Sequence, residues 1–186
     1  EIHEIGLSEV ARIHGEMHEV MKQVGFEGDL QAFFKFMTTD KQFEFKSEKD
    51  LLDAYNALRA KIDLKIPEQF SLLPKAGFEI RPVEPFRAES MAGGQYFPPS
   101  EDGTRPGIFY VNTFDLPSRK SWDAEDLYLH EAIPGHHFQI SLAHENPDLP
   151  PFRQDFATTA YTEGWAEYAS GLAGELGLFA DPYDLY

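Results

Sequence analysis

The spacing of apolar residues changes twice along this 186-residue chain, and that change constrains the fold more than any other feature. In the first 75 residues, apolar side chains recur at steps of three and four, which is the period of an amphipathic helix. We expect helices over about 8–24, 30–37 and 48–63, with Ser8 and Ser47 as N-caps of the first and the third. These helices are expected to form core and to carry no chemistry.

Short β-prone runs occupy the middle of the chain. They are separated by turns that contain proline and glycine, such as Pro98-Pro99. A small β-sheet is the natural interpretation of this pattern. The three runs are Phe78–Val83, Gln95–Phe97 and Gly107–Thr113.

Helical periodicity then returns, over about 123–144 and 155–177. The sequence therefore predicts one α+β domain, mostly α, with helices over 1–75, a small sheet over 76–120 and further helices over 121–186. Because the chain begins without an initiator methionine, we also expect it to be a fragment of a longer chain. The rest of that chain is expected to pack on the last group of helices.

The composition excludes several classes of protein. An apolar fraction of 42% is too high for a disordered chain, and no apolar run approaches the roughly 18 residues of a membrane span. With no cysteine, disulfide scaffolds, thiol catalysis and thiolate metal sites are excluded. The net charge of −16 argues against a nucleic-acid partner, which needs a basic face. Residues 121–186 hold twelve acids, one base and four of the seven histidines, which leaves a cation site open there.

The chemistry-bearing stretch begins with the pair His130-Glu131 and continues to the adjacent His136 and His137. A His-Glu pair followed by a further histidine is the zincin arrangement, in which two imidazoles bind Zn²⁺ and the glutamate is the general base. This pattern predicts one zinc per chain, with His130 as a ligand and Glu131 as the catalytic base.

The spacing departs from the usual HExxH, because the position four after His130 is Pro134. On a straight helix His136 lies roughly 240° around from His130, whereas His137 returns to within about 20° but some 10 Å along the axis. Pro134 and Gly135 interrupt helical regularity, so we expect the hydrogen-bond ladder to break between residues 132 and 135. A bulge there would bring His136 beside His130, and His137 remains the alternative ligand.

A second motif offers two acids on one helix face. Glu163 and Glu167 are four residues apart, so they lie on the same side of the last predicted helix. A glutamate from a separate helix is the third ligand in glutamate-type zincins, which assigns Glu163 to the metal. Glu167 is then expected to accept a hydrogen bond from the second ring nitrogen of a ligand histidine, or to serve as an alternative ligand.

Together the two motifs resemble a known family. His-Glu-Ala-Ile-Pro-Gly-His-His-Phe-Gln (130–139) and Glu-Gly-Trp-Ala-Glu-Tyr (163–168) are similar to the bacterial family called domain of unknown function 885 (DUF885). The resemblance covers the whole chain and places it beside gluzincin-like metallopeptidases such as angiotensin-converting enzyme. It implies a zincin-like fold, with His130, His136 and Glu163 as zinc ligands after a two-residue insertion.

The resemblance also implies a function. We expect a zinc-dependent peptidase that hydrolyses peptide bonds through a metal-activated water, with Glu131 as the base. Two alternatives remain: a non-catalytic metal- or peptide-binding domain, and a zinc hydrolase of another amide. The compartment cannot be deduced from the sequence, and the family resemblance favours export as a periplasmic protein or lipoprotein.

Two further sets of residues need an interpretation. Gly107–Thr113 is expected to be a core strand and also the sheet's edge strand beside the active-site helix, with Tyr110 and Asn112 as substrate contacts. Tyr161 and Tyr168 flank the presumed ligand helix, and we expect both to pack in the core.

Overall fold

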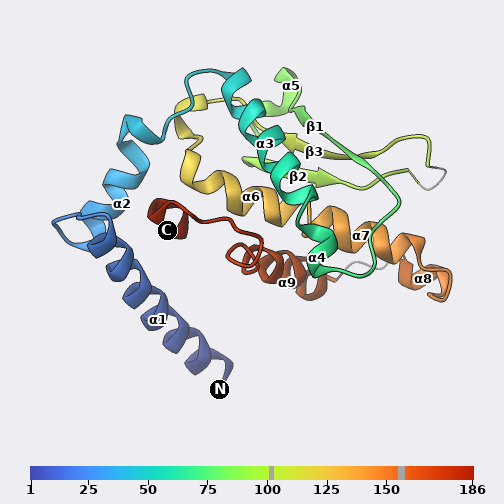
Figure 1. Cartoon of the computed structure of the whole chain (residues 1–186), viewed down its shortest axis with the longest axis horizontal. Helices are drawn as coiled ribbons and strands as arrows, with labels where there is room; N and C mark the ends of the chain where they lie inside the picture. Colours follow the sequence, from blue (N-terminus) through green and yellow to red (C-terminus); the bar gives the residue numbers. More distant parts are fainter. Residues whose placement is uncertain (101–102, 155–157) are drawn as a thin grey trace.

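The chain folds into helices that flank a three-stranded sheet. The computed structural model describes residues 1–100, 103–154 and 158–186, and Figure 1 shows its elements. The helices are α1 (Ile2–Gln23), α2 (Leu30–Thr39), α3 (Glu48–Asp63), α4 (Ile66–Gln69), α5 (Pro85–Ala88), α6 (Ala124–Glu131), α7 (His136–Glu145), α8 (Pro151–Gln154) and α9 (Thr159–Ser170). The strands are β1 (Phe78–Pro82), β2 (Gly94–Phe97) and β3 (Gly107–Val111). The expected α+β fold, mostly α, is confirmed.

One predicted cap is present and the other is not. The Ser47 hydroxyl accepts a hydrogen bond from the Asp50 N–H (3.1 Å) at the start of α3, as expected. The prediction for Ser8 is wrong, because α1 begins at Ile2 and the Ser8 hydroxyl donates to the Ile5 carbonyl inside the helix (2.8 Å). The predicted start of the last helix, at 155–157, lies outside the described residues, and α9 ends at Ser170, earlier than expected.

The three strands form one sheet in the order β1-β3-β2. Strand β3 pairs in parallel with β1 and antiparallel with β2, so it is central. The expectation that Gly107–Thr113 is the edge strand is therefore wrong, and β2 is the edge strand nearest the helices α6 and α7. The physical reason is that β1 and β2 pair on opposite sides of β3, and this enclosure explains its near-continuous burial.

Helices α3 and α6 pack on the same face of the sheet. The ring of Phe109 in β3 contacts Tyr55 of α3 (centroids 5.2 Å apart) and Tyr128 of α6 (6.3 Å). All three side chains are buried, in a core cluster that also contains Leu129 and Phe138. This packing fixes α6 and the start of α7 against the sheet, and those two helices carry the predicted site.

A second, smaller core joins the two ends of the chain. Val20 and Met21 at the end of α1 pack with Phe33 of α2, and the aromatic rings of Tyr183 and Tyr186 close this cluster. The first half of α1 projects away from the rest of the molecule (Figure 1), and its apolar side chains are exposed. Across the described ranges no helix, α1 included, is long and apolar enough to cross a membrane.

Candidate metal centre

The helical ladder breaks where the sequence predicts. Helix α6 ends at Glu131 and α7 begins at His136. Between them Ala132 leaves the helical region (φ −104°, ψ −106°), and the peptide bond before Pro134 is cis. The two histidines of the motif therefore lie on two different helices.

Gly135 is required at this junction for a steric reason. A Cβ atom at this position would lie 1.9 Å from the carbonyl oxygen of His130 and 2.2 Å from that of Leu129. Its φ is −76°, so the need for glycine comes from this close approach and not from a left-handed backbone. The start of α7 is thereby held directly against the end of α6.

Helix α9 is anchored to the same junction. The indole N–H of Trp165 donates a hydrogen bond to the Pro134 carbonyl (2.7 Å), and the ring contacts the core cluster. Ala166 and Ala169 are fully buried, which lets α9 approach α6 and α7 closely. This anchoring brings Glu163 of α9 to the two histidines.

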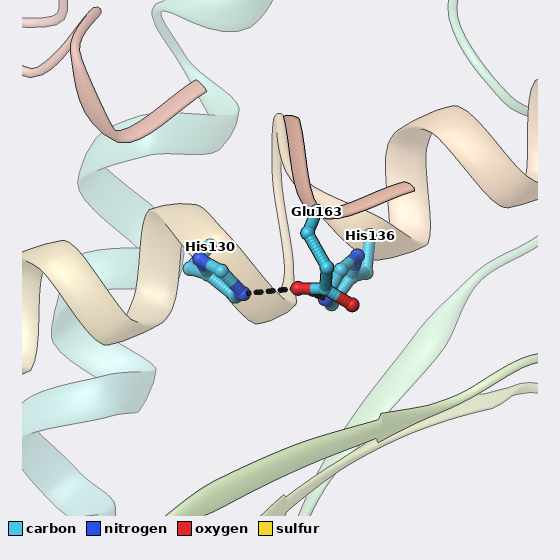
Figure 2. Close-up of side chains that lie close together, drawn as sticks. All are labelled: His130, His136 and Glu163. Atoms are coloured by element: carbon cyan, nitrogen blue, oxygen red, sulfur yellow. Dashed lines mark ion pairs between the residues drawn. The ribbon is translucent and has the colours of Figure 1, made fainter. Parts of the chain in front are cut away.

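His130, His136 and Glu163 converge on one point (Figure 2). The Oε2 atom of Glu163 lies 3.3 Å from Nε2 of His130 and 3.4 Å from Nε2 of His136. In a tetrahedral zinc site with bonds of about 2.0–2.1 Å, neighbouring donor atoms are about 3.3–3.4 Å apart. Both separations match that edge, and the three donor atoms all lie within 4.8 Å of one another, so this group could hold a metal ion such as zinc.

The burial of the three residues is uneven. The side chains of His130 and His136 are largely enclosed, whereas Glu163 is half exposed. Burial lowers the pKa of His136, which favours the neutral imidazole that a metal requires. Its Nδ1 atom is buried without a hydrogen-bond partner among the described residues. The cluster is thus built into the protein on the histidine side and open on the glutamate side.

Glu167 approaches the cluster but does not complete a hydrogen bond. Its Oε1 atom lies 3.8 Å from Nδ1 of His130, beyond the hydrogen-bond range, and its side chain is mostly exposed. Glu167 lies on the Nδ1 side of His130, but the expected hydrogen bond between them is not formed in this structure.

His137 points away from the cluster, as the predicted bulge requires. Its ring is buried, and Nε2 lies 3.0 Å from the Ala76 carbonyl, so Nε2 carries the hydrogen and donates it. Nδ1 then accepts from the Tyr96 hydroxyl (2.8 Å). Burial lowers the pKa of His137 to about 4, consistent with a neutral ring. With both nitrogens engaged, His137 is not among the groups that could hold the metal in this structure.

Glu131 is buried beside His130 at the end of α6. Burial raises the pKa of its carboxyl, while the neighbouring His130 and the Tyr96 backbone lower it. Glu131 is not part of the three-residue donor cluster, so the structure keeps it separate from the predicted ligands.

The structure does not bring Tyr110 and Asn112 to the cluster. Asn112 is buried, and its amide donates to the Ala88 and Met91 carbonyls (2.7 and 2.9 Å). Tyr110 alternates with Phe109 and so faces the other side of the sheet, where the Arg87 guanidinium covers its ring.

The expectation that Tyr161 and Tyr168 pack in the core is wrong. They are 56% and 58% exposed, because the core-facing positions of α9 are taken by the small residues Ala166, Ala169 and Ser170. Sequence reasoning also missed Tyr96, the partner of His137. Its run was recognised as a strand, but no local signal indicates that its hydroxyl meets a histidine 41 residues later.

Fold and site together define a small α+β domain in which helices α6, α7 and α9 each contribute one residue to a His₂Glu cluster. The chain belongs to a family that is described as "Bacterial protein of unknown function (DUF885)", which matches it over residues 1–186. Among solved structures it is similar to a protein from Colwellia psychrerythraea described as a "putative lipoprotein", with 33% identity and a TM-score of 0.93. That match covers 98% of this chain and 32% of the other, so this chain spans about a third of that relative. No curated protein matches.

Proposed function

We propose that this domain carries the metal site of a zinc-dependent peptidase related to the gluzincins. The observation that supports it best is the pair of 3.3 and 3.4 Å separations that join Glu163 to the two histidines. Both imidazoles present Nε2 to the same carboxylate oxygen of Glu163, and these two separations equal the edge length of a tetrahedral zinc site. The sequence resemblance to the gluzincin motif supports the same assignment.

Each residue has a distinct role in this proposal. His130, His136 and Glu163 would hold the ion. Zinc bound there would supply an acidified water and a Lewis acid for the scissile carbonyl. Glu131 accepts the proton of the attacking water and passes it to the leaving amine. Its burial supports this role, because a raised pKa strengthens a carboxylate as a base.

The alternatives use the same cluster differently. A non-catalytic metal- or peptide-binding domain would bind zinc without catalysing a reaction. A zinc hydrolase of another class would cleave an amide that is not a peptide bond. Turnover of a peptide library separates the peptidase from both. The exposed Glu163 edge of the cluster favours a site that admits a substrate over a closed structural one.

The test combines metal content with one substitution. We expect protein purified without exposure to a chelator to contain about one zinc per chain, as measured by elemental analysis. Glu131→Gln should keep that zinc and lower peptidase activity by at least about 100-fold, because it removes a base and not a ligand. Glu175→Gln, an exposed carboxylate beyond the end of α9 with no assigned role, is the control and should retain full zinc content and activity. A Glu131→Gln variant without zinc would make Glu131 a ligand, and absence of zinc from the native protein would refute the proposal.

Two expectations concern the protein beyond this domain. We propose that additional chain packs against the exposed Tyr161 and Tyr168 of α9, since these aromatic side chains have little cover here. We also propose that the protein is exported, which the description of the Colwellia psychrerythraea relative supports. Cell fractionation tests the second expectation, and protection of the two tyrosines from modification in the longer protein tests the first.

A further inference from the structure

Helix α9 meets its neighbours through small side chains. Ala166 and Ala169 are fully buried where α9 packs on α6 and α7, whereas the large side chains of Tyr161 and Tyr168 are exposed. Small residues let two helices approach closely, but their shallow ridges resist sliding and rotation only weakly. The alanines therefore bring α9 close without fixing which of its acids reaches the histidines.

Trp165 adds a directional contact to this packing. Its indole Nε1–H donates to the Pro134 carbonyl over 2.7 Å, and Pro134 lies in the segment that joins α6 to α7. The Trp165 ring also lies 6.5 Å from the ring of Phe70, which in turn lies 4.7 Å from the ring of Phe138 in α7. Because such a hydrogen bond does not extend to about 3.6 Å, a shift of α9 by about 1 Å along the bond would break it.

The two acids of α9 make its register important. Oε2 of Glu163 lies 3.3 Å from Nε2 of His130, and Oε1 of Glu167 lies 3.8 Å from Nδ1 of the same ring. Residues four apart in an α-helix are separated by about 6 Å along the axis and point in nearly the same direction. A slide of α9 by one turn would therefore place Glu167 where Glu163 now lies, and a smaller slide would make the two acids competitors. Trp165 is midway between them in the sequence, so its bond restrains both.

The second tryptophan of the chain makes the same kind of bond elsewhere. The indole Nε1–H of Trp122 donates to the Met37 carbonyl over 3.1 Å, and its ring lies 4.8 Å from that of Tyr186. These three residues belong to the second, smaller core and not to the junction of α6 and α7. Loss of either indole N–H removes one bond to a backbone carbonyl, so comparison of the two separates a general effect on stability from an effect on the metal site.

We propose that Trp165 is a positioning residue, which fixes the register of α9 on the junction of α6 and α7 and thereby makes Glu163, and not Glu167, the third metal ligand. The inference rests on the proposed function insofar as the cluster binds zinc, and it does not depend on the substrate. Trp165 is not itself one of the three donor residues. It raises the fraction of molecules in which Glu163 faces His130 and His136, and the apparent metal affinity scales with that fraction.

Trp165→Phe is the first test, because it removes the N–H and keeps an aromatic ring. We expect the zinc dissociation constant of the folded protein to rise about 10- to 100-fold, the range for loss of a residue that orients a ligand. Competition with a chromophoric chelator measures this constant. Trp122→Phe is the matched control and should leave the constant within about threefold of the native value. A merely structural role of Trp165 would lower the midpoint of denaturant unfolding in both variants and leave both zinc constants unchanged.

The choice between the two acids needs a second readout. In the native background Glu163→Gln should weaken zinc binding at least about 100-fold, and Glu167→Gln should weaken it less than about tenfold. In the Trp165→Phe background the effects of the two substitutions should come within about threefold of each other, because either acid can then reach the ion. The two double-mutant cycles measure how strongly Trp165 is coupled to each acid.

The outcomes separate this inference from the proposed function. Equal zinc constants in Trp165→Phe and Trp122→Phe would overturn the positioning role and leave the metal site standing. An unchanged ratio between the Glu163→Gln and Glu167→Gln effects in the Trp165→Phe background would overturn the selection of Glu163. Zinc bound without turnover of any peptide would refute the peptidase and leave this inference intact, whereas absence of zinc from the native protein would refute both.

Discussion

Helices α1 and α7 both contain histidines and apolar residues, but the molecule constrains them very differently. In α7 the first four residues are all buried, and contacts with β2, α6 and α9 define their orientation. In α1, only Val20 and Met21 near the end are buried, and the first half is exposed to solvent. Helical periodicity alone therefore does not locate the core or the site. What matters is which helix the rest of the chain encloses.

The largest effect is expected at the α6–α7 junction. Gly135→Ala places a methyl group against the carbonyl oxygen of His130, and we expect the free energy of unfolding to fall by more than about 4 kcal/mol, with loss of zinc. Gly15→Ala in α1 is the matched control, since nothing lies within 4 Å of its Cβ, and it should stabilise by up to about 1 kcal/mol. Thermal and denaturant unfolding measure both. A Gly135→Ala protein with native stability would show that the junction is looser than described.

The next effect concerns metal affinity. His136→Ala removes a metal ligand, and we expect it to weaken zinc binding by at least about 100-fold. Loss of a residue that only hydrogen-bonds to a ligand already lowers metal affinity about 10- to 100-fold. His14→Ala in the exposed part of α1 should leave the affinity unchanged. Competition with a chromophoric chelator measures both constants. If His14→Ala weakens binding as much as His136→Ala, the assigned cluster is not the metal site.

The smallest effect is expected in α1 itself. Ile5→Ala removes an exposed side chain and should change the free energy of unfolding by less than about 0.5 kcal/mol. Phe138→Ala in α7 removes a side chain that is 2% exposed and should cost about 3–5 kcal/mol. Denaturant midpoints of the two variants give the contrast directly. A cost above about 1 kcal/mol for Ile5→Ala would mean that α1 is covered in solution.

Local chemistry predicted much of this molecule. Ser47 caps α3, the strands occur near their expected runs, and the break before His136 follows from Pro134 and Gly135. The grouping of His130, His136 and Glu163 was expected from the zincin-like pattern and the family resemblance, whereas the packing of α9 on α6 and α7 that brings Glu163 there is tertiary.

The errors in the sheet and around the candidate site share a physical cause, which is that tertiary packing decides them. Whether β3 is central depends on β1, about 30 residues earlier in the chain, and not on its own residues. The same holds for Asn112, whose amide binds two distant carbonyls, and for Tyr161 and Tyr168, whose exposure depends on how α9 is rotated. Likewise Tyr96 acquired its importance only when the fold placed it against His137.

The break between α6 and α7 has a thermodynamic consequence. In an HExxH helix the two histidines are held together by one turn of backbone, so the ligand spacing survives as long as that helix does. Here the spacing depends on the angle between two helices and on the Pro134 carbonyl held by Trp165 of α9. An ion bound by His130, His136 and Glu163 would therefore cross-link three helices, and its binding free energy would add to the stability of the fold by linkage. At a free concentration 100 times the dissociation constant, that contribution is about 2.7 kcal/mol. The supply of metal would then determine the folded stability of this domain as well as its activity.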